Sequence, residues 1–304
     1  MVGPTAAGKS DLAVDLALRL GGEVVNADSM QVYLGMDIGT AKLSVAERRG
    51  VPHHLLDVLG VTQPATVAEF QAMARAAVDH CLARGVVPVL VGGSALYVRA
   101  VLDPFDFPGT DPGVRARLEA ELADVGVEEM HGRLAASDPE VAARILPSNA
   151  RRVVRALEVR EITGEAYRPS LPPRAYAYEG AVQVGVDMPG EVLDRRIEAR
   201  VGRMFRAGLV DEVRALVAIG LREGRTASRA LGYAQVLRHL DGDLTEEEAR
   251  AETVRATRRF ARRQDSWFRK DPRVTWVPYD AADRVDLALE IIGGPGRVFR
   301  HTTG

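Results

Sequence analysis

Cysteine is almost absent from this chain, and its scarcity excludes a whole class of folds. Cys81 is the single cysteine among 304 residues, so no internal disulfide framework can form, and the composition suits a reducing compartment. Long apolar runs are missing too: none approaches the roughly 20 residues of a membrane span, and no charged-then-apolar leader precedes the first motif. We therefore expect a cytoplasmic protein without a membrane partner, and a monomer by default.

The chain also has no strong excess of positive or negative charge, and its histidines do not follow a metal-binding pattern. The formal net charge is −2, which as a whole-chain value indicates no particular partner. The six histidines show no zinc-ligand spacing, and His53 and His54 are adjacent, so they cannot both face one metal in a regular element. Histidine-based metal sites are therefore disfavoured. The length and a hydrophobic content of 46% provide a core for one large or two ordinary domains.

What the chain does have is a complete phosphate-binding loop near its beginning. The G-x-x-x-x-G-K-S pattern comprises Gly3, Pro4, Thr5, Ala6, Ala7, Gly8, Lys9 and Ser10. The glycines permit a tight wrap with inward N–H groups, and a helix expected over Asp11–Leu20 adds its positive N-terminal end. The lysine can reach terminal phosphates, and the serine hydroxyl suits Mg²⁺. We therefore expect a polyphosphate site with Mg²⁺ as cofactor and Ser10 as its ligand.

A buried strand ordinarily precedes such a loop, but only Met1 and Val2 stand before this one. We expect either that the natural start lies further upstream or that the chain has been cut. In both cases the first strand is expected to be short or absent.

The first third of the chain alternates between expected strands and helices. Glu23–Ala27 and the apolar run Val86–Val91 read as strands, with an amphipathic helix over Val67–Arg84 between them. Continuous apolar strands separated by helices indicate a parallel sheet covered on both faces. The phosphate loop, Asp28 and Gly92-Gly93-Ser94 then all fall at the carboxyl ends of strands, where such sheets bind ligands.

A helical block interrupts this pattern. Between two proline-rich connectors, Asp103–Pro112 and Pro169–Pro173, the periodicity over Val114–Thr163 is helical only. We expect an α/β fold: a P-loop NTPase-like parallel sheet core (1–110 and 180–304), a helical insertion domain (111–179) and a helical C-terminal third. In that last part we expect strands over Ala181–Asp187 and Val274–Val277, a disordered tail over Arg297–Gly304, and helices over Glu191–Ala207, Val210–Ile219, Ser228–Leu240 and Glu246–Lys270.

Basic residues concentrate on two of the expected helices. The last helix of the insertion and the long C-terminal helix carry arginines at a spacing of three to four, which places several guanidinium groups on one face: Arg151, Arg152, Arg155, Arg160, Arg255, Arg258, Arg259, Arg262, Arg263 and Arg269. A solvated face explains such a run by itself. In a chain that also binds a polyphosphate, nucleic acid is an equally good explanation.

A phosphate loop alone predicts binding of a nucleotide such as ATP, for hydrolysis or kinase chemistry. No apolar strand ending in an aspartate with a water-positioning partner is evident, as an ATPase requires. Further motifs follow along nearly the whole chain: Asp28–Tyr33, Gly35–Lys42, Pro52–Asp57, Leu90–Tyr97, Asn149–Glu158, Arg196–Arg200, Leu231–Tyr233 and Arg258–Arg269. In this order they resemble the tRNA dimethylallyltransferase family, the isopentenyl transferases that modify adenosine 37.

The resemblance implies a reaction and roles for three residues. The loop would hold the diphosphate of dimethylallyl diphosphate rather than ATP, and the allyl group would pass to N6 of the adenine. Asp28 matches the family's general base, although a strand-end aspartate also caps the next turn. Ser94 matches a residue that contacts the substrates, or it caps a helix. Arg200 matches the arginine that meets the departing diphosphate, or is a surface arginine.

The resemblance also implies contacts with the tRNA anticodon stem-loop. The matching positions are Asp28, Ser29, Met30, Gln31, Ser94, Arg115, Arg151, Arg152, Arg155, Arg229, Gly232 and Tyr233. Many family members carry Arg or Lys after Gly-Tyr, whereas this chain has Ala234, which puts one charged RNA contact in doubt. Trp267, in the Arg-Gln-x-x-Trp-x-Arg stretch, is expected in the core rather than stacked on a base.

Three alternatives stay open at this point. The first is an adenylate isopentenyltransferase acting on free AMP, ADP or ATP, which would have little need for an insertion domain and basic helices. The second is a small-molecule kinase on the same core, which would consume ATP without a prenyl donor. The third is an RNA-binding protein without catalytic activity, in which Asp28 would have no role in product formation.

Overall fold

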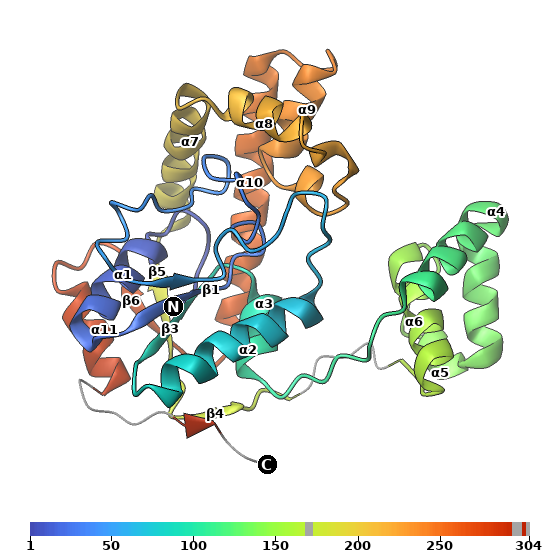
Figure 1. Cartoon of the computed structure of the whole chain (residues 1–304), viewed down its shortest axis with the longest axis horizontal. Helices are drawn as coiled ribbons and strands as arrows, with labels where there is room; N and C mark the ends of the chain where they lie inside the picture. Colours follow the sequence, from blue (N-terminus) through green and yellow to red (C-terminus); the bar gives the residue numbers. More distant parts are fainter. Residues whose placement is uncertain (168–172, 294–299, 302–304) are drawn as a thin grey trace. The chain divides into compact units, whose positions relative to one another are not determined.

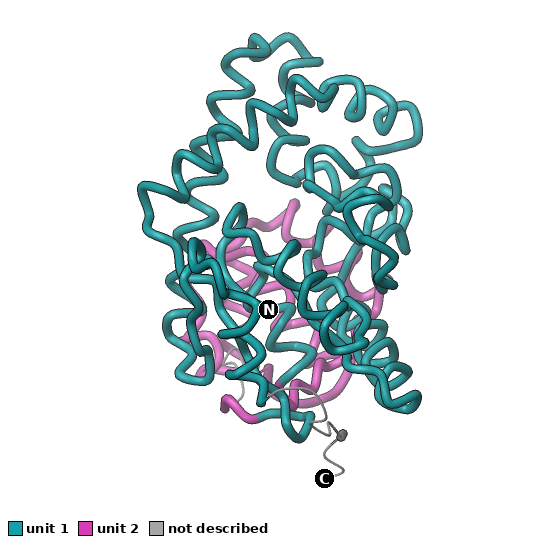
Figure 2. Tube along the Cα trace, turned by 90° about the vertical axis from the view of Figure 1, so that its left-hand side faces the viewer, with its two compact units in different colours: residues 1–102, 176–304 teal, residues 103–175 magenta. Residues whose placement is uncertain are grey.

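The computed structural model describes residues 1–167, 173–293 and 300–301 (Figure 1). The chain divides into two compact units, residues 1–102 with 176–304 and residues 103–175, coloured separately in Figure 2. Sequence patterns indicated an insertion over 111–179, so the structure places both of its boundaries earlier. Among the described residues, no helix is both long and apolar enough to cross a membrane.

Two short parallel sheets lie in the first unit. One has the order β2 (His53–His54), β1 (Glu23–Asn26), β3 (Pro88–Val91), and the other pairs β5 (Gln183–Asp187) with β6 (Val274–Pro278). All four residues of β1 are buried, as expected for a strand between covering layers. The expected mixed α/β class with a parallel sheet is therefore confirmed.

Met1 and Val2 join these two sheets. Val2 forms a parallel bridge with Gly185 of β5, and the N–H of Gly92, just after β3, donates to the carbonyl of Met1 at 3.1 Å. The two residues thus occupy the position of a strand between β3 and β5, directly before the phosphate loop. The first strand, expected to be short or absent, is reduced to the single bridge at Val2.

Helices of the first unit pack around these sheets on a common core. Capping boxes begin α2 at Thr66 and α10 at Thr245, which satisfies N–H groups that a helix start leaves free. The helices are α1 (Lys9–Leu20), α2 (Val67–Ala83), α3 (Ala95–Leu102), α7 (Gly190–Arg206), α8 (Leu209–Val217), α9 (Tyr233–Leu240), α10 (Glu246–Arg269) and α11 (Arg284–Ile292), with short 3₁₀ turns η1 (Leu221–Glu223) and η2 (Ala227–Arg229).

Two expectations for the C-terminal part are wrong. The helix expected over Ser228–Leu240 is split into η2 and α9, because Gly232 takes φ 88° and interrupts the helical backbone. The tail was expected to be disordered, but Arg300–His301 forms β7, which pairs antiparallel with β4 (Tyr178–Glu179). The rest of that tail lies outside the described residues.

Among its described residues, the second unit contains helices and no strands, as predicted. It consists of α4 (Pro112–Ser137), α5 (Pro139–Ala142) and α6 (Ala150–Thr163). Gly126 interrupts α4 with φ 81°, and Gly164 ends α6 in the left-handed conformation. Its buried apolar residues form a core of their own, so the unit has the internal packing of a small helical domain.

Candidate functional site

The phosphate loop lies between Val2 and α1, and the conformation of its backbone explains why glycine occupies two of its positions. Gly3 and Gly8 have φ values of 133° and 90°, which residues with a side chain rarely adopt. A Cβ on Gly3 would also lie only 3.3 Å from the carbonyl oxygen of Val186 in β5. Because α1 begins directly after the loop, its free N–H groups and the loop amides can bind an anion together.

Lys9 is buried beside this loop. Its Nζ donates to the carbonyl oxygen of Pro4 at 2.7 Å. Burial, and after it the charge of Arg200, lower the pKa of Lys9 from its usual 10.5 to about 7, although the Asp28 carboxylate opposes both effects. Burial and the neighbouring guanidinium thus disfavour the charged form of Lys9, and a bound diphosphate would favour it.

Asp28 stands at the carboxyl end of β1, held by its own neighbours. The side chain of Asn26 accepts from the Asp28 N–H at 2.9 Å and donates to its carbonyl at 3.1 Å. The Oδ1 atom of Asp28 accepts from the N–H of Met30 at 2.9 Å, so this aspartate does cap the following turn. Its Oδ2 atom has no hydrogen bond to the described residues. The carboxylate therefore keeps one oxygen available for a substrate.

Arg200 projects from α7 toward the phosphate loop. One of its guanidinium nitrogens lies 3.5 Å from Oγ1 of Thr5. Burial lowers the pKa of Arg200, as do the charges of Arg203 and Arg196, while Asp11 and Asp28 raise it. A partly desolvated arginine beside an anion cradle is suited to neutralise a departing diphosphate.

Residues of the phosphate loop, Asp28 and Arg200 line one cavity. It is lined by Thr5, Ala6, Gly8, Lys9, Ser10, Asp11, Asn26, Asp28, Gln31, Thr40, Ala41, Leu43, Val91, Gly92, Gly93, Arg200 and Gln264. The predicted meeting of motifs from different strand ends is thus what the structure shows. The arrangement combines an anion-binding backbone, two cations (Lys9 and Arg200) and two carboxylates (Asp11 and Asp28) in one cavity.

Gln264 of α10 closes this cavity against the phosphate loop. Its Oε1 atom accepts from the N–H of Thr5 at 2.8 Å, and its amide nitrogen would lie 2.4 Å from a Cβ on Gly93. Glycine at that position therefore makes room for the glutamine. Gln264 therefore occupies the N–H group of Thr5, which could otherwise donate to a phosphate oxygen.

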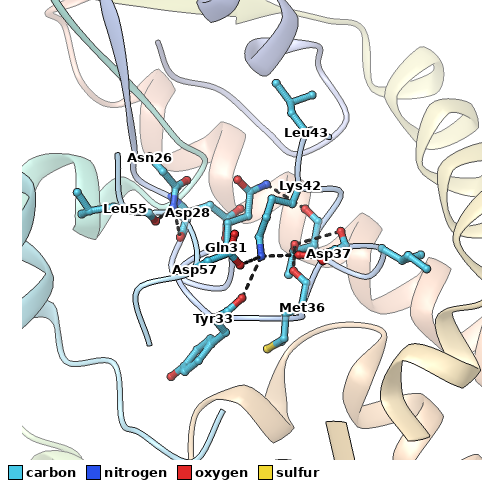
Figure 3. Close-up of polar contacts among 12 residues, drawn as sticks. Asn26, Asp28, Gln31, Tyr33, Met36, Asp37, Lys42, Leu43, Leu55 and Asp57 are labelled. Atoms are coloured by element: carbon cyan, nitrogen blue, oxygen red, sulfur yellow. Dashed lines mark hydrogen bonds and ion pairs between the residues drawn. The ribbon is translucent and has the colours of Figure 1, made fainter. Parts of the chain in front are cut away.

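The segment after Asp28 is fixed by a buried lysine. Lys42 donates to the carboxylates of Asp37 and Asp57, both at 2.6 Å, and to the carbonyl of Tyr33 at 3.0 Å (Figure 3). Its side chain is only 3% exposed. Sequence reasoning assigned no role to these three side chains, although all lie in motifs that resemble the family. Their function is to hold the wall of the cavity that contains Gln31 and Thr40.

Several residues expected to contact RNA are placed outside this cavity. Arg229 is exposed next to α9, and Arg151 and Arg152 are exposed on α6. Ser94 follows Gly93 at the start of α3, but it is not among the residues that line the cavity. Ser29 and Met30 are half-buried in the turn after Asp28.

Two further residues expected to contact RNA form ion pairs with one carboxylate within the second unit. Arg115 and Arg155 both bind the carboxylate of Glu158, which is fully buried. Burial alone would raise the pKa of Glu158, but hydrogen bonds from the two arginines bring it below its usual value. Losing either cation would leave a buried charge poorly compensated, so both arginines have a structural role.

The structure also places two aromatic residues contrary to expectation. Tyr233 is completely buried and its hydroxyl bonds to Glu212, so its side chain presents no surface to an RNA. Trp267 was expected in the core, but 44% of it is exposed. Buried residues of α10 include Ala261, Gln264 and Phe268, and Trp267 lies off that face of the helix.

A second polar cluster lies at the opposite, amino end of β1. Glu23, His54 and Cys81 bring their ligand-type atoms within 4.8 Å of one another, but Arg84 donates to the same Glu23 carboxylate at 2.7 Å. Hydrogen bonds from Arg84 and His54 lower the pKa of Glu23 to about 2. With a guanidinium already in place, the cluster serves to tie α2 to the sheet.

Comparisons with known proteins identify the family of the chain. The model of the IPP transferase family matches residues 31–271. The chain belongs to this family. A tRNA dimethylallyltransferase of Thermobifida fusca is 65% identical over 297 residues, covering 96% of this chain and 93% of the relative. One from Streptomyces coelicolor is 64% identical over 298 residues, covering 97% and 95%.

A solved structure shares the fold of this family member. The full-length tRNA isopentenylpyrophosphate transferase of Bacillus halodurans superposes with a TM-score of 0.71 at 41% identity, covering 96% of this chain and 94% of that one. The match therefore extends over both units of the chain, not only over the sheet and its phosphate loop.

Proposed function

We propose that this protein is a tRNA dimethylallyltransferase, which moves the dimethylallyl group of dimethylallyl diphosphate to N6 of adenosine 37 and releases diphosphate. The cavity in which the phosphate loop, Arg200 and Asp28 face one another is the observation that carries the proposal. Relatives at 64–65% identity over nearly the whole chain bear this name.

The phosphate loop is the proposed donor site, on a P-loop-type core. Loop amides, Lys9 and Arg200 hold the diphosphate and stabilise the charge that develops when it departs. The hydroxyl of Ser10 and the carboxylate of Asp11 line the same cavity and are oxygen donors of the kind that Mg²⁺ binds beside phosphates. Bound there, Mg²⁺ would neutralise part of the diphosphate charge.

Asp28 is the proposed general base on the acceptor side. The N6 lone pair of the adenine forms a bond to the allylic carbon, while the carbon–oxygen bond to the diphosphate breaks and its electron pair leaves with the diphosphate. One N6 proton passes to the Asp28 carboxylate. An adenine stacked in an RNA loop cannot enter this cavity, so the base must first be extruded.

Exposed arginines are the proposed contacts to RNA phosphates. They include Arg151 and Arg152 on α6, Arg229 beside α9, and Arg259 and Arg263 on α10. Other arginines of α10 are partly neutralised in ion pairs: Arg258 with Glu198, Arg262 with Asp194 and Arg269 with Asp187. The basic face of α10 that is available to RNA is therefore smaller than the sequence suggested.

A comparison of two acceptors in parallel reactions tests the proposed function. Labelled dimethylallyl diphosphate is offered with an anticodon stem-loop carrying A36-A37 and, in parallel, with AMP. We expect the stem-loop to be labelled roughly tenfold faster or more, because phosphate contacts add RNA affinity that AMP lacks. A stem-loop with guanosine at position 37 is the matched control and should stay unlabelled. Faster labelling of AMP would favour an adenylate isopentenyltransferase instead.

A further inference from the structure

A single carboxylate on α8 holds three consecutive backbone N–H groups of the segment after Asp28. Oε2 of Glu212 accepts from Asp37 at 3.1 Å and from Ile38 at 2.7 Å, and Oε1 accepts from Gly39 at 3.1 Å. Successive N–H groups around an anion form a nest, and hydrogen bonds to a charged acceptor are stronger than neutral ones. Glu212 therefore fixes this backbone segment to the C-terminal helices.

Tyr233 completes the same contact from α9. Its hydroxyl donates to Oε1 of Glu212 at 2.5 Å. Burial and the neighbouring Glu212 charge raise the pKa of Tyr233, so the hydroxyl keeps the proton that it donates. A Cβ on Gly39 would lie 2.4 Å from the Tyr233 ring. Glycine at position 39 thus allows the backbone to approach the aromatic ring.

The clamped segment leads directly into the cavity. Thr40 and Ala41, which follow Gly39, line it, and the side chain of Gln31 donates to the carbonyl of Thr40 at 3.1 Å. Ala41 takes φ 52°, a conformation that costs free energy for a residue with a side chain and persists only when its surroundings hold it. Glu212 holds the segment on one side of Ala41, and Lys42 fixes it on the other.

We infer that Glu212 and Tyr233 are positioning residues for prenyl transfer, which hold the Thr40–Ala41 wall of the cavity against the substrates. The inference rests on the proposed function and changes one part of it. The family resemblance implies that Tyr233 contacts RNA, whereas the geometry assigns its side chain to the clamp. Loss of the clamp should therefore slow the transfer step and leave RNA affinity unchanged.

The test compares Glu212→Gln and Tyr233→Phe with Asp211→Asn, a matched control on the same helix whose side chain is 81% exposed. Glutamine replaces one carboxylate oxygen with an amide N–H₂ group, which cannot accept from the backbone N–H groups of residues 37–39. We expect kcat to fall about 10- to 100-fold in Glu212→Gln, since small displacements of a reacting group are costly. In Tyr233→Phe we expect kcat to fall about fivefold, which corresponds to the loss of one hydrogen bond. Stem-loop Kd and Asp211→Asn activity should match the wild type.

Hydrogen exchange provides a readout that does not depend on activity. Amides of residues 37–39 should exchange faster in Glu212→Gln than in the wild type, with the core amides unchanged. Wild-type kcat in both clamp variants, or a loss confined to stem-loop affinity, would overturn the inference. If Glu212→Gln does not fold, Tyr233→Phe decides by the same criteria. If the wild type transfers no prenyl group, the proposed function fails, while the exchange result still tests the clamp.

Discussion

Replacing Asp28 by asparagine is expected to abolish nearly all prenyl transfer while RNA binding is retained. The amide keeps the shape of the side chain, and its carbonyl oxygen can still accept from the N–H of Met30, as Oδ1 does now at 2.9 Å. It cannot accept the N6 proton, so we expect kcat to fall roughly 10²- to 10⁴-fold. Single-turnover transfer from labelled dimethylallyl diphosphate to an anticodon stem-loop measures the change.

Two comparisons separate catalysis by Asp28 from its structural role. Asp28→Ala also removes the hydrogen-bond acceptor of the Met30 N–H. If kcat falls further in Asp28→Ala than in Asp28→Asn, the additional fall is due to the disturbed turn and not to the loss of the base. Stem-loop Kd should stay at the wild-type value in both, because one carboxylate adds little to an affinity that phosphate contacts dominate. Unchanged product formation in Asp28→Asn would contradict the assigned base and favour an RNA-binding protein without catalytic activity.

Removing the Arg200 guanidinium is the second change with a large expected effect. Arg200 stands beside Thr5 in the cavity, where in the proposed reaction negative charge accumulates on the diphosphate as the allyl group leaves. We expect Arg200→Ala to lower kcat/KM for the donor about 10²- to 10³-fold. Arg200→Lys should recover part of this loss, since it restores the charge without the planar donor geometry.

Diphosphate binding measured by calorimetry gives an independent readout for the same variant. Affinity for free diphosphate should weaken in Arg200→Ala, while stem-loop affinity stays close to that of the wild type. Arg206→Ala is the matched control, because Arg206 is exposed in the last turn of the same helix. Equal losses in the two variants would show that the general positive charge of α7, rather than Arg200 itself, supports the reaction.

The proposed catalytic cavity could be predicted from sequence because its parts lie in local motifs. Gly3 and Gly8 mark the loop, and Asp28 follows a buried strand, so the geometry of a parallel sheet brings them to one edge. Arg200 was assigned through the family motif on an expected helix. For these residues, a motif of a few neighbouring positions in the sequence was sufficient to predict their place in the cavity.

Residues that hold the cavity together could not be found in this way. Glu212 and Ile38 are 174 positions apart, and no local pattern relates them. The burial of Tyr233 depends on the same long-range contact. Trp267 is a different case, because the buried positions 261, 264 and 268 of α10 already follow a helical period that leaves it outside. Its exposure could have been predicted from spacing alone.

A structure of the protein with an anticodon stem-loop and an unreactive diphosphate analogue tests the central claim most directly. We expect the diphosphate on the loop amides in place of Gln264, with Lys9 turned from Pro4 toward it. The extruded adenine should place N6 about 2.6–3.2 Å from the Asp28 carboxylate. An adenine outside this cavity, or an Asp28 carboxylate turned away from N6, would contradict the account.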